Sequence, residues 1–167
     1  GAHLVDMDGN VKHAWPAIRE HAKPLPEGRV IGRTKEGKRI AELDWEGNVI
    51  WEFDGTAYKE ELDPHHDFQR EGNPVGYFVP DMRPETTGKT LILCKTGVEG
   101  TGLVAGRILD DRIIEVDEKG SILWAWHSTE PVDELKLSET ARNAMYRASM
   151  LQKEYDGRRG PQRAKDP

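Results

Sequence analysis

One pattern occurs three times in the chain and constrains its fold more than any other feature. It consists of an aspartate, two variable residues, a glycine, a polar residue and then aliphatic residues. The copies are VDMDGNVKHAW at residues 5–15, LDWEGNVIWEF at 43–53 and VDEKGSILWAW at 116–126. A pattern that recurs this closely indicates an internal repeat, and a repeat decides the architecture before any local feature does.

Each copy of the repeat predicts a β-hairpin. In residues 39–53 the side chains alternate with a period of two, Gly47 and Asn48 supply turn chemistry, and the following VIWEF is rich in β-branched and aromatic residues. Residues two positions apart on a strand share one face, so we expect a pair of rings from each copy to pack against a neighbouring sheet. These pairs lie four and six positions past the glycine: His13 and Trp15, Trp51 and Phe53, and Trp124 and Trp126.

The spacing of the repeats favours an all-β fold made of propeller blades, each a four-stranded antiparallel meander. The first two glycines are 38 residues apart, close to the ~40 to 50 residues of a blade. We expect a half blade at 1–16, a blade at 17–54 with a weakly marked strand near 18–23, and a blade at 55–127. The last spacing is longer, which we attribute to an inserted loop at 70–88.

The chain changes character after the third repeat. Residues 128–167 are expected to hold one helix, at about 138–155 with Ser138 as its N-cap, and a polar tail. A closed propeller needs about four to eight blades, whereas the repeats account for about two and a half. The sequence therefore predicts a partial propeller and a second polypeptide that supplies the remaining blades, as in a hetero-oligomer.

Composition narrows the partners. The chain has 24 basic and 30 acidic side chains and a formal net charge of -6, which gives no general attraction to nucleic acid or to an anionic membrane. No apolar run approaches the ~20 residues of a membrane-spanning helix, so we expect a soluble protein, periplasmic or cytoplasmic. Cys94 is the single cysteine, so no internal disulfide forms, and its place in a predicted strand indicates a core position.

The segment ELDPHHDFQRE at residues 61–71 is the candidate site. His65 and His66 are the candidate catalytic residues, because an imidazole in a channel can act as base, acid or nucleophile. Asp67 is expected on the same side as His65, where a carboxylate can orient an imidazole. Asp67 and Arg70 are the candidate substrate-binding residues.

No cofactor is predicted. The chain has no His-x-His, no paired cysteines and no His-Glu-x-x-His helix, so a metal ion, if one binds, is assigned to His65 and His66. The aspartate–glycine turns lack the spacing of a calcium loop, and the glycine-rich residues 95–106 lack a Walker lysine. The other histidines are scattered along the chain, and His13 replaces a core aromatic residue of the other copies.

Together these residues resemble the arylsulfotransferase family of β-propellers. The similar stretches are HLVDMDGNVKHAWP, GKRIAELDWEGNVIWEF, HHDFQREGN, TLIL and DRIIEVDEKGSILWAWH, which follow one another between residues 3 and 127. The resemblance is carried by Asp-Trp-x-Gly-Asn, two hydrophobic residues and Trp, with His-His-Asp following. The helical LSETARNAMY also looks like a segment in members that continue into further blades.

Members of this family are six-bladed propellers that transfer a sulfuryl group from a phenolic sulfate ester to another phenol. In them a channel histidine attacks sulfur, while other histidines and an arginine stabilise the equatorial oxygens. The resemblance implies that His65 or His66 is a channel histidine with a charge-stabilising role, and that the nucleophile lies in later blades. The insertion at 70–88 stands where relatives have a tight turn. It is expected to change the shape of the channel mouth and hence the substrate.

Two other functions remain open at this point. The same histidine pocket would suit a metal-dependent hydrolase, lyase or hydratase, with ligands drawn from several blades. Alternatively the chain is a binding or assembly module without chemistry, since a propeller scaffold does not by itself define a reaction.

Overall fold

The computed structural model describes residues 1–72, 87–99 and 102–159. Most of this part of the chain is antiparallel β-sheet, with one α-helix and three short 3-10 helices. The chain divides into two compact units. The first contains residues 1–96 and 111–127, and the second contains residues 97–110 and the C-terminal segment from Ser128.

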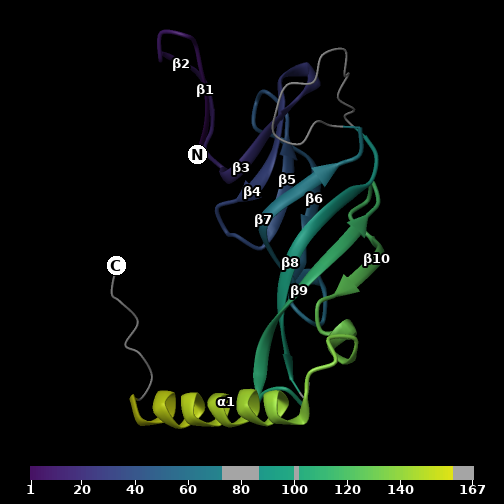
Figure 1. Cartoon of the computed structure of the whole chain (residues 1–167). Coiled ribbons are helices and arrows are strands. Elements are labelled where there is room, and N and C mark those ends of the chain that lie inside the picture. Colours follow the sequence, from purple (N-terminus) through teal and green to yellow (C-terminus); the bar gives the residue numbers. More distant parts are fainter. Residues whose placement is uncertain (73–86, 100–101, 160–167) are drawn as a thin grey trace. The chain divides into compact units, whose positions relative to one another are not determined.

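The strands form three antiparallel sheets in chain order (Figure 1). The first is a hairpin, and the other two are meanders of four consecutive strands. The hairpin contains β1 (Ala2–Val5) and β2 (Val11–Trp15). The second sheet contains β3 (Ile18–Leu25), β4 (Arg29–Thr34), β5 (Arg39–Leu43) and β6 (Val49–Asp54). The third contains β7 (Asp63–Arg70), β8 (Thr90–Glu99), β9 (Arg107–Val116) and β10 (Ile122–His127).

The sequence repeat forms the turns between β1 and β2, β5 and β6, and β9 and β10. In each turn the aspartate Oδ1 accepts a hydrogen bond from the backbone N–H four residues later. The distance is 2.8 Å in Asp6–Asn10, 2.7 Å in Asp44–Asn48 and 2.8 Å in Asp117–Ser121. The glycine of each turn has φ of +85°, +87° or +78°, a region that glycine adopts without steric cost. The predicted hairpins are thus present, and the aspartates serve turn geometry.

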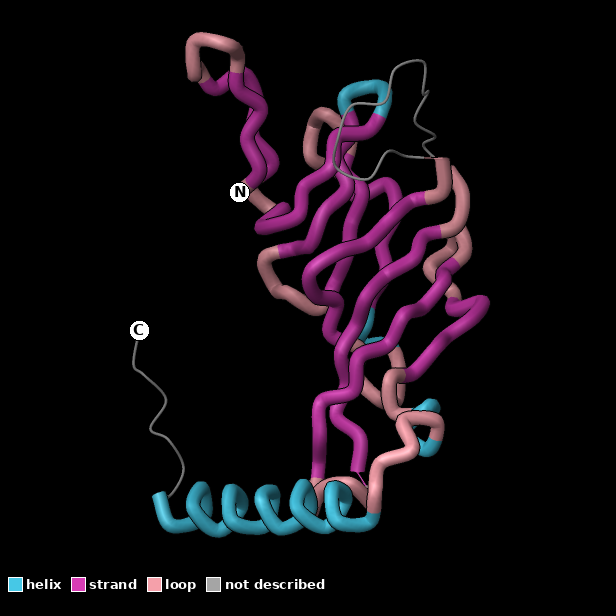
Figure 2. The backbone as a smooth tube through the Cα atoms, in the orientation of Figure 1, coloured by secondary structure: helices cyan, strands magenta, loops and turns pink. Residues whose placement is uncertain are grey.

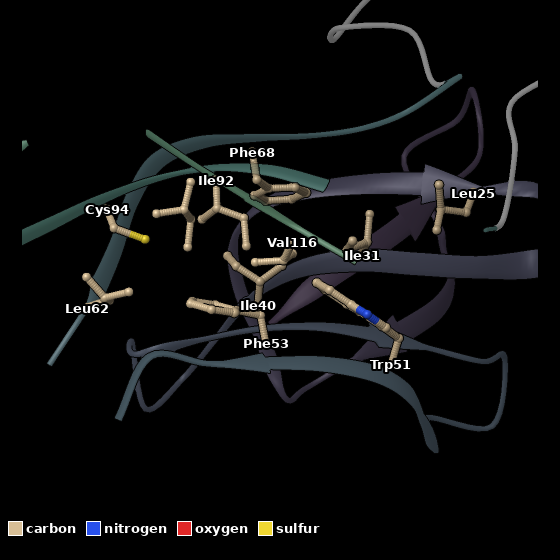
Figure 3. Close-up of a cluster of buried hydrophobic side chains, with 11 residues drawn as sticks. Leu25, Ile31, Ile40, Trp51, Phe53, Leu62, Phe68, Ile92, Cys94 and Val116 are labelled. Atoms are coloured by element: carbon tan, nitrogen blue, oxygen red, sulfur yellow. The ribbon is translucent and has the colours of Figure 1, made fainter. Parts of the chain in front are cut away.

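The main core lies between the second and third sheets, which pack face to face (Figures 2 and 3). Residues of β3 to β6 point into it from one side, and residues of β7, β8 and β9 from the other. On β6, β8 and β9 the buried residues lie two positions apart, as strand geometry requires. Trp51 and Phe53 share this buried face, as their spacing predicts. The cluster consists of Leu25, Ile31, Ile40, Trp51, Phe53, Leu62, Phe68, Ile92, Cys94, Ile114 and Val116.

A smaller core joins the β1–β2 hairpin to the opposite face of the second sheet. Trp15 packs there with Ile18, Val30, Ala41 and Leu43. Its indole Nε1 donates to the backbone oxygen of Asp44 at 2.8 Å, which satisfies the one polar atom of the ring. His13 stacks on Trp45 with 3.9 Å between ring centroids, so its predicted packed role is confirmed.

The second unit contains the outer parts of β8 and β9, a 3-10 helix (Glu130–Asp133) and α1 (Glu139–Arg159). The carboxylate of the fully buried Asp110 accepts from Ser128 Oγ at 2.8 Å and from Thr129 N at 3.0 Å. Ser138 caps α1, because its Oγ accepts from Ala141 N at 3.2 Å. The helix predicted near 138–155 is therefore present and extends one turn further.

The predicted antiparallel sheets are present, and the weakly marked strand near 18–23 is β3. Within the described residues the sheets do not close into a ring or barrel. Of the insertion predicted at 70–88, residues 73–86 lie outside the described part of the chain. No helix among the described residues is long and apolar enough to cross a lipid bilayer.

Candidate functional site

The predicted histidine pair lies at a bulge in β7. The pairing of β7 with β8 shifts between Pro64 and Phe68, so β7 carries extra residues at this point. His66 has φ of +55°, which is uncommon for a residue with a Cβ atom. A bulge of this kind breaks the period-two alternation and redirects the side chains around it.

A second bulge interrupts β3, the first strand of the other meander. The pairing of β3 with β4 shifts between Glu20 and Lys23, and His21 within it also has φ of +55°. His21 is the fourth residue of β3, and His66 is the fourth residue of β7. The two meanders therefore present a histidine at equivalent positions of their first strands.

The two bulges line one shallow recess, which we call the histidine recess and which is too small in this structure to hold a water molecule. The rings of His65 and His66 are 4.9 Å apart between centroids and lie edge to face. His21 is the third imidazole of the recess, and sequence reasoning missed it. The signal for it was available, because IREHAKPL aligned with DPHHDFQR places His21 at the position of His66. The lining residues are His21, Arg33, Ile40, Pro64, His65, His66, Asp67 and Phe68.

His65 is held by a carboxylate from a different strand. Its Nε2 lies 3.1 Å from Oδ1 of Asp111 on β9. When Nε2 carries the proton it donates to Asp111, and Nδ1 keeps a lone pair that can accept a proton or bind an electrophile. The expectation that Asp67 orients the imidazole of His65 is wrong, because the bulge places Asp111 in that position.

Asp67 instead joins the two bulges through Lys23. Lys23 Nζ donates to Asp67 Oδ1 at 2.7 Å and also to the backbone oxygen of Phe68, and it lies 4.8 Å from the centre of the Phe68 ring. Burial acts to raise the pKa of the Asp67 carboxyl, but the hydrogen bonds from Lys23 and Phe68 N outweigh it. The pKa of Asp67 is therefore below its ordinary value, and the carboxylate stays charged beside the recess.

Arg70 points into the interior, away from the residues that line the recess. Its Nη1 donates to Oε2 of the buried Glu42 at 3.1 Å, and its Nε donates to Thr90 Oγ1 at 2.7 Å. The guanidinium also lies 4.7 Å from the centre of the Trp51 ring. Burial lowers the pKa of Arg70, and the Glu42 carboxylate opposes that effect. These contacts support a structural role for Arg70 between the two meanders, and its predicted role in binding substrate stays a prediction.

Cys94 is not placed to act as a nucleophile. The side chain is fully buried in the main core, and burial raises the pKa of its thiol to about 12. A thiol with so high a pKa carries almost no thiolate at neutral pH. The predicted core position of Cys94 is confirmed.

The chemical capacity of the recess follows from its groups. Three imidazoles can donate hydrogen bonds to an oxyanion, accept protons or attack an electrophilic centre. Among the described residues, no three histidine, cysteine or acidic side chains converge as metal ligands. No family model matches the chain, and no curated protein matches it.

Proposed function

We propose that this chain is part of an arylsulfotransferase-like β-propeller that acts on a phenolic or similar small aromatic substrate. The observation that carries the proposal is that His21, His65 and His66, from bulges in the first strands of two repeated meanders, line one recess. In this proposal the meanders are blades, β3 and β7 are their innermost strands, and the histidine recess is part of the axial channel. The resemblance of residues 3–127 to the family supplies the reaction.

The proposed reaction is sulfuryl transfer through a histidine. An imidazole nitrogen attacks the sulfur of an aryl sulfate, the bond from sulfur to the phenolic oxygen breaks, and the phenolate leaves. An acceptor phenol then gives its proton to a base and attacks sulfur, which releases the imidazole. We assign His65 and His66 to stabilising negative charge on the sulfuryl oxygens, and the attacking imidazole to another histidine of the completed channel.

The surroundings of the recess suit this charge-stabilising role. Asp111 fixes the orientation of the His65 ring through Nε2. His66 gains its direction from the bulge, since the left-handed backbone at this residue turns the side chain out of the usual alternation. Substrate binding by Asp67 is part of the proposal through its contact with Lys23, which brings a cation to the rim of the recess.

The complete channel requires further blades, and we assign these to a second polypeptide. The three sheets of this chain stack in order and leave apolar surface on the outer side of β10. A binding or assembly module is the second candidate function, because this exposed surface is what such a module would use.

The test uses the native particle that contains this chain, incubated with 4-nitrophenyl sulfate and phenol. Release of nitrophenolate that depends on phenol is the expected result. His65→Ala and His66→Ala should each lower the rate by about 10²-fold or more, as removal of a charge-stabilising donor does. His127→Ala is the matched control, because this histidine is not among those that line the recess.

Three outcomes separate the candidates. Loss of activity on addition of a chelator would replace sulfuryl transfer with metal-dependent chemistry. Absence of turnover with a series of aryl sulfates, or rates in both variants equal to wild type, would refute the proposal. Retention of partner binding in such inactive particles would favour the assembly module.

A further inference from the structure

The interface between successive sheets is built twice in the same way inside this chain. In the first instance the ring pair of β2 lies against the third strand and the aspartate–glycine turn of the next sheet. Trp15 donates to the backbone oxygen of Asp44, His13 stacks on Trp45, and Trp15 shares a core with Leu43. The contact surface is thus β5 and its turn.

The second instance places a ring pair against the equivalent strand one sheet further along. The ring pair of β6, Trp51 and Phe53, shares a core with Ile114 and Val116 of β9. Tyr58 Oη donates to the backbone oxygen of Gly120 at 3.0 Å, in the turn that follows β9. A Cβ atom on Gly120 would lie only 2.8 Å from a backbone oxygen of β6, so β6 approaches this turn closely.

The third ring pair is only partly covered, since Trp124 is exposed and Trp126 is half-buried. Trp124 and Trp126 of β10 lie opposite Glu115 and Ile113 in the sheet register, on the side that faces away from the main core. Trp124 is 50% exposed, and its neighbours Ile113 and Leu91 are exposed as well. We call Leu91, Ile113, Trp124 and Trp126 the tryptophan face. Like the two internal interfaces it combines a ring pair with aliphatic residues, and Leu91, Ile113 and Trp124 of this face are exposed.

The complementary surface is exposed at the other end of the stack. When the three sequence repeats are aligned on their turn aspartates, Val5 takes the position of Leu43 and Val116. Both of these residues are buried in the internal interfaces. Met7 aligns with Trp45, the partner of His13, and it is fully exposed, while Val5 and its register partner Val11 are 53% and 60% exposed. We call Val5, Met7 and Val11 the hairpin face. It offers the third strand and turn that a ring pair contacts in both internal interfaces.

We propose that the tryptophan face of one copy of this chain binds the hairpin face of a second copy. The contact continues the stacking of sheets within the chain across the boundary between molecules. It places Met7 of one copy against Trp124 of the other, a pairing of sulfur with an aromatic ring that is favourable in proteins. Because the two faces differ, the association is heterologous, and it either closes into a ring or propagates.

This proposal rests on the part of the proposed function that assigns further sheets to a second polypeptide, and it identifies that polypeptide. It does not depend on sulfuryl transfer. The chain exposes the tryptophan face and the hairpin face, and surfaces equivalent to these two bury each other in the internal interfaces. Each face therefore finds its matching surface on a second copy of the chain. Burial of two such faces removes apolar area from water, which is the main driving force of association.

The test is the mass of the 167-residue chain in solution, by sedimentation over a range of concentrations. Wild type should form oligomers whose mass is a multiple of 18.9 kDa. Trp124→Glu and Met7→Glu should each yield monomers at concentrations where wild type is assembled. Leu151→Glu, which changes an exposed apolar residue on α1, is the control and should leave the mass unchanged.

A mixing experiment decides whether the contact is heterologous. The Trp124→Glu chain keeps an intact hairpin face, and the Met7→Glu chain keeps an intact tryptophan face. An equimolar mixture should therefore give a dimer that neither variant forms alone. Circular dichroism of each variant must match wild type, so that loss of association reports the surface.

Each contrary outcome overturns the inference. A wild-type monomer at all concentrations would leave the tryptophan face to a different polypeptide. Association that survives both substitutions, or that Leu151→Glu abolishes, would place the contact elsewhere. A mixture that stays monomeric would exclude a heterologous contact. The sulfuryl-transfer assay on the native particle reports the chemistry separately in every case.

Discussion

Glu42 is expected to be one of the most sensitive positions for stability. It is only 1% exposed and accepts hydrogen bonds from two arginines, at 3.2 Å from Arg29 Nη1 and at 3.1 Å from Arg70 Nη1. Arg29 reaches solvent and is also paired with Glu27, so it tolerates the loss of Glu42. Arg70 is buried and keeps its charge at any accessible pH, so removing Glu42 takes a carboxylate from a buried guanidinium.

The magnitude follows from these contacts. Removing one partner of a buried ion pair costs about 3–5 kcal/mol, so we expect Glu42→Leu to lower the free energy of unfolding by an amount in that range. Arg70→Met should cost less, about 2–3 kcal/mol, because Glu42 keeps its hydrogen bond to Arg29 and loses one charged partner. Replacing both partners together should recover most of the loss, since apolar pairs often substitute for buried ion pairs at little cost.

The assay is urea unfolding at one fixed protein concentration, followed by tryptophan fluorescence and circular dichroism. Fluorescence is informative because the Arg70 guanidinium lies over the ring of Trp51. The four proteins form a double-mutant cycle, in which the coupling energy between Glu42 and Arg70 should exceed about 1 kcal/mol. A loss below about 1 kcal/mol for Glu42→Leu, or strict additivity in the double variant, would refute the reasoning.

Three further predictions concern single positions. Gly47→Ala should cost about 1–2 kcal/mol of unfolding free energy, because only the left-handed backbone opposes an alanine there. Gly120→Ala should cost at least about 1 kcal/mol more, because its Cβ atom would also meet a backbone oxygen of β6 at 2.8 Å. Equal losses of the two variants in urea unfolding would contradict this. Cys94 should react with Ellman's reagent only in denaturant, since burial raises its pKa to about 12; rapid labelling of the native chain would show an accessible thiolate. The hydrogen bond from Lys12, with those from the turn, lowers the pKa of the Asp6 carboxyl from 3.8 to about 2. Since the folded pKa is depressed, Asp6 stabilises the hairpin above the unfolded value and loses this contribution as pH falls through about 2. An NMR titration should show this pKa, and Lys12→Met should move it toward 3.8; an unchanged value in Lys12→Met would show that the turn alone causes the shift.

The hairpins and the helix start were predictable from the sequence because their causes are local. Each hairpin turn is closed by hydrogen bonds within five residues, for example Asp117 with Ser121, so the pattern contains the physical cause of the structure. The start of α1 is also determined locally, because Ser138 Oγ accepts a hydrogen bond from the backbone N–H three residues later, at Ala141. The buried spacing of Trp51 and Phe53 also followed from strand alternation alone.

The candidate site was only partly predictable, because bulges depend on strand pairing. His65 and Asp67 share a face in an unbroken strand, and the register shift against β8 separates them. His65 is paired with Asp111 and Asp67 is paired with Lys23, and each partner lies more than forty residues away in the sequence. No local pattern specifies such contacts. His21 was missed for the same reason, since it joins the recess through a bulge of its own.

The three hairpin turns have a consequence for the history of this chain. Each turn satisfies its backbone N–H groups with an aspartate of its own block, so a copied block brings these hydrogen bonds with it. Trp15 and Tyr58, in contrast, donate to backbone oxygens in the turn of the next sheet. Duplication or deletion of a block must therefore supply these two acceptors as well as matching apolar faces at each joint.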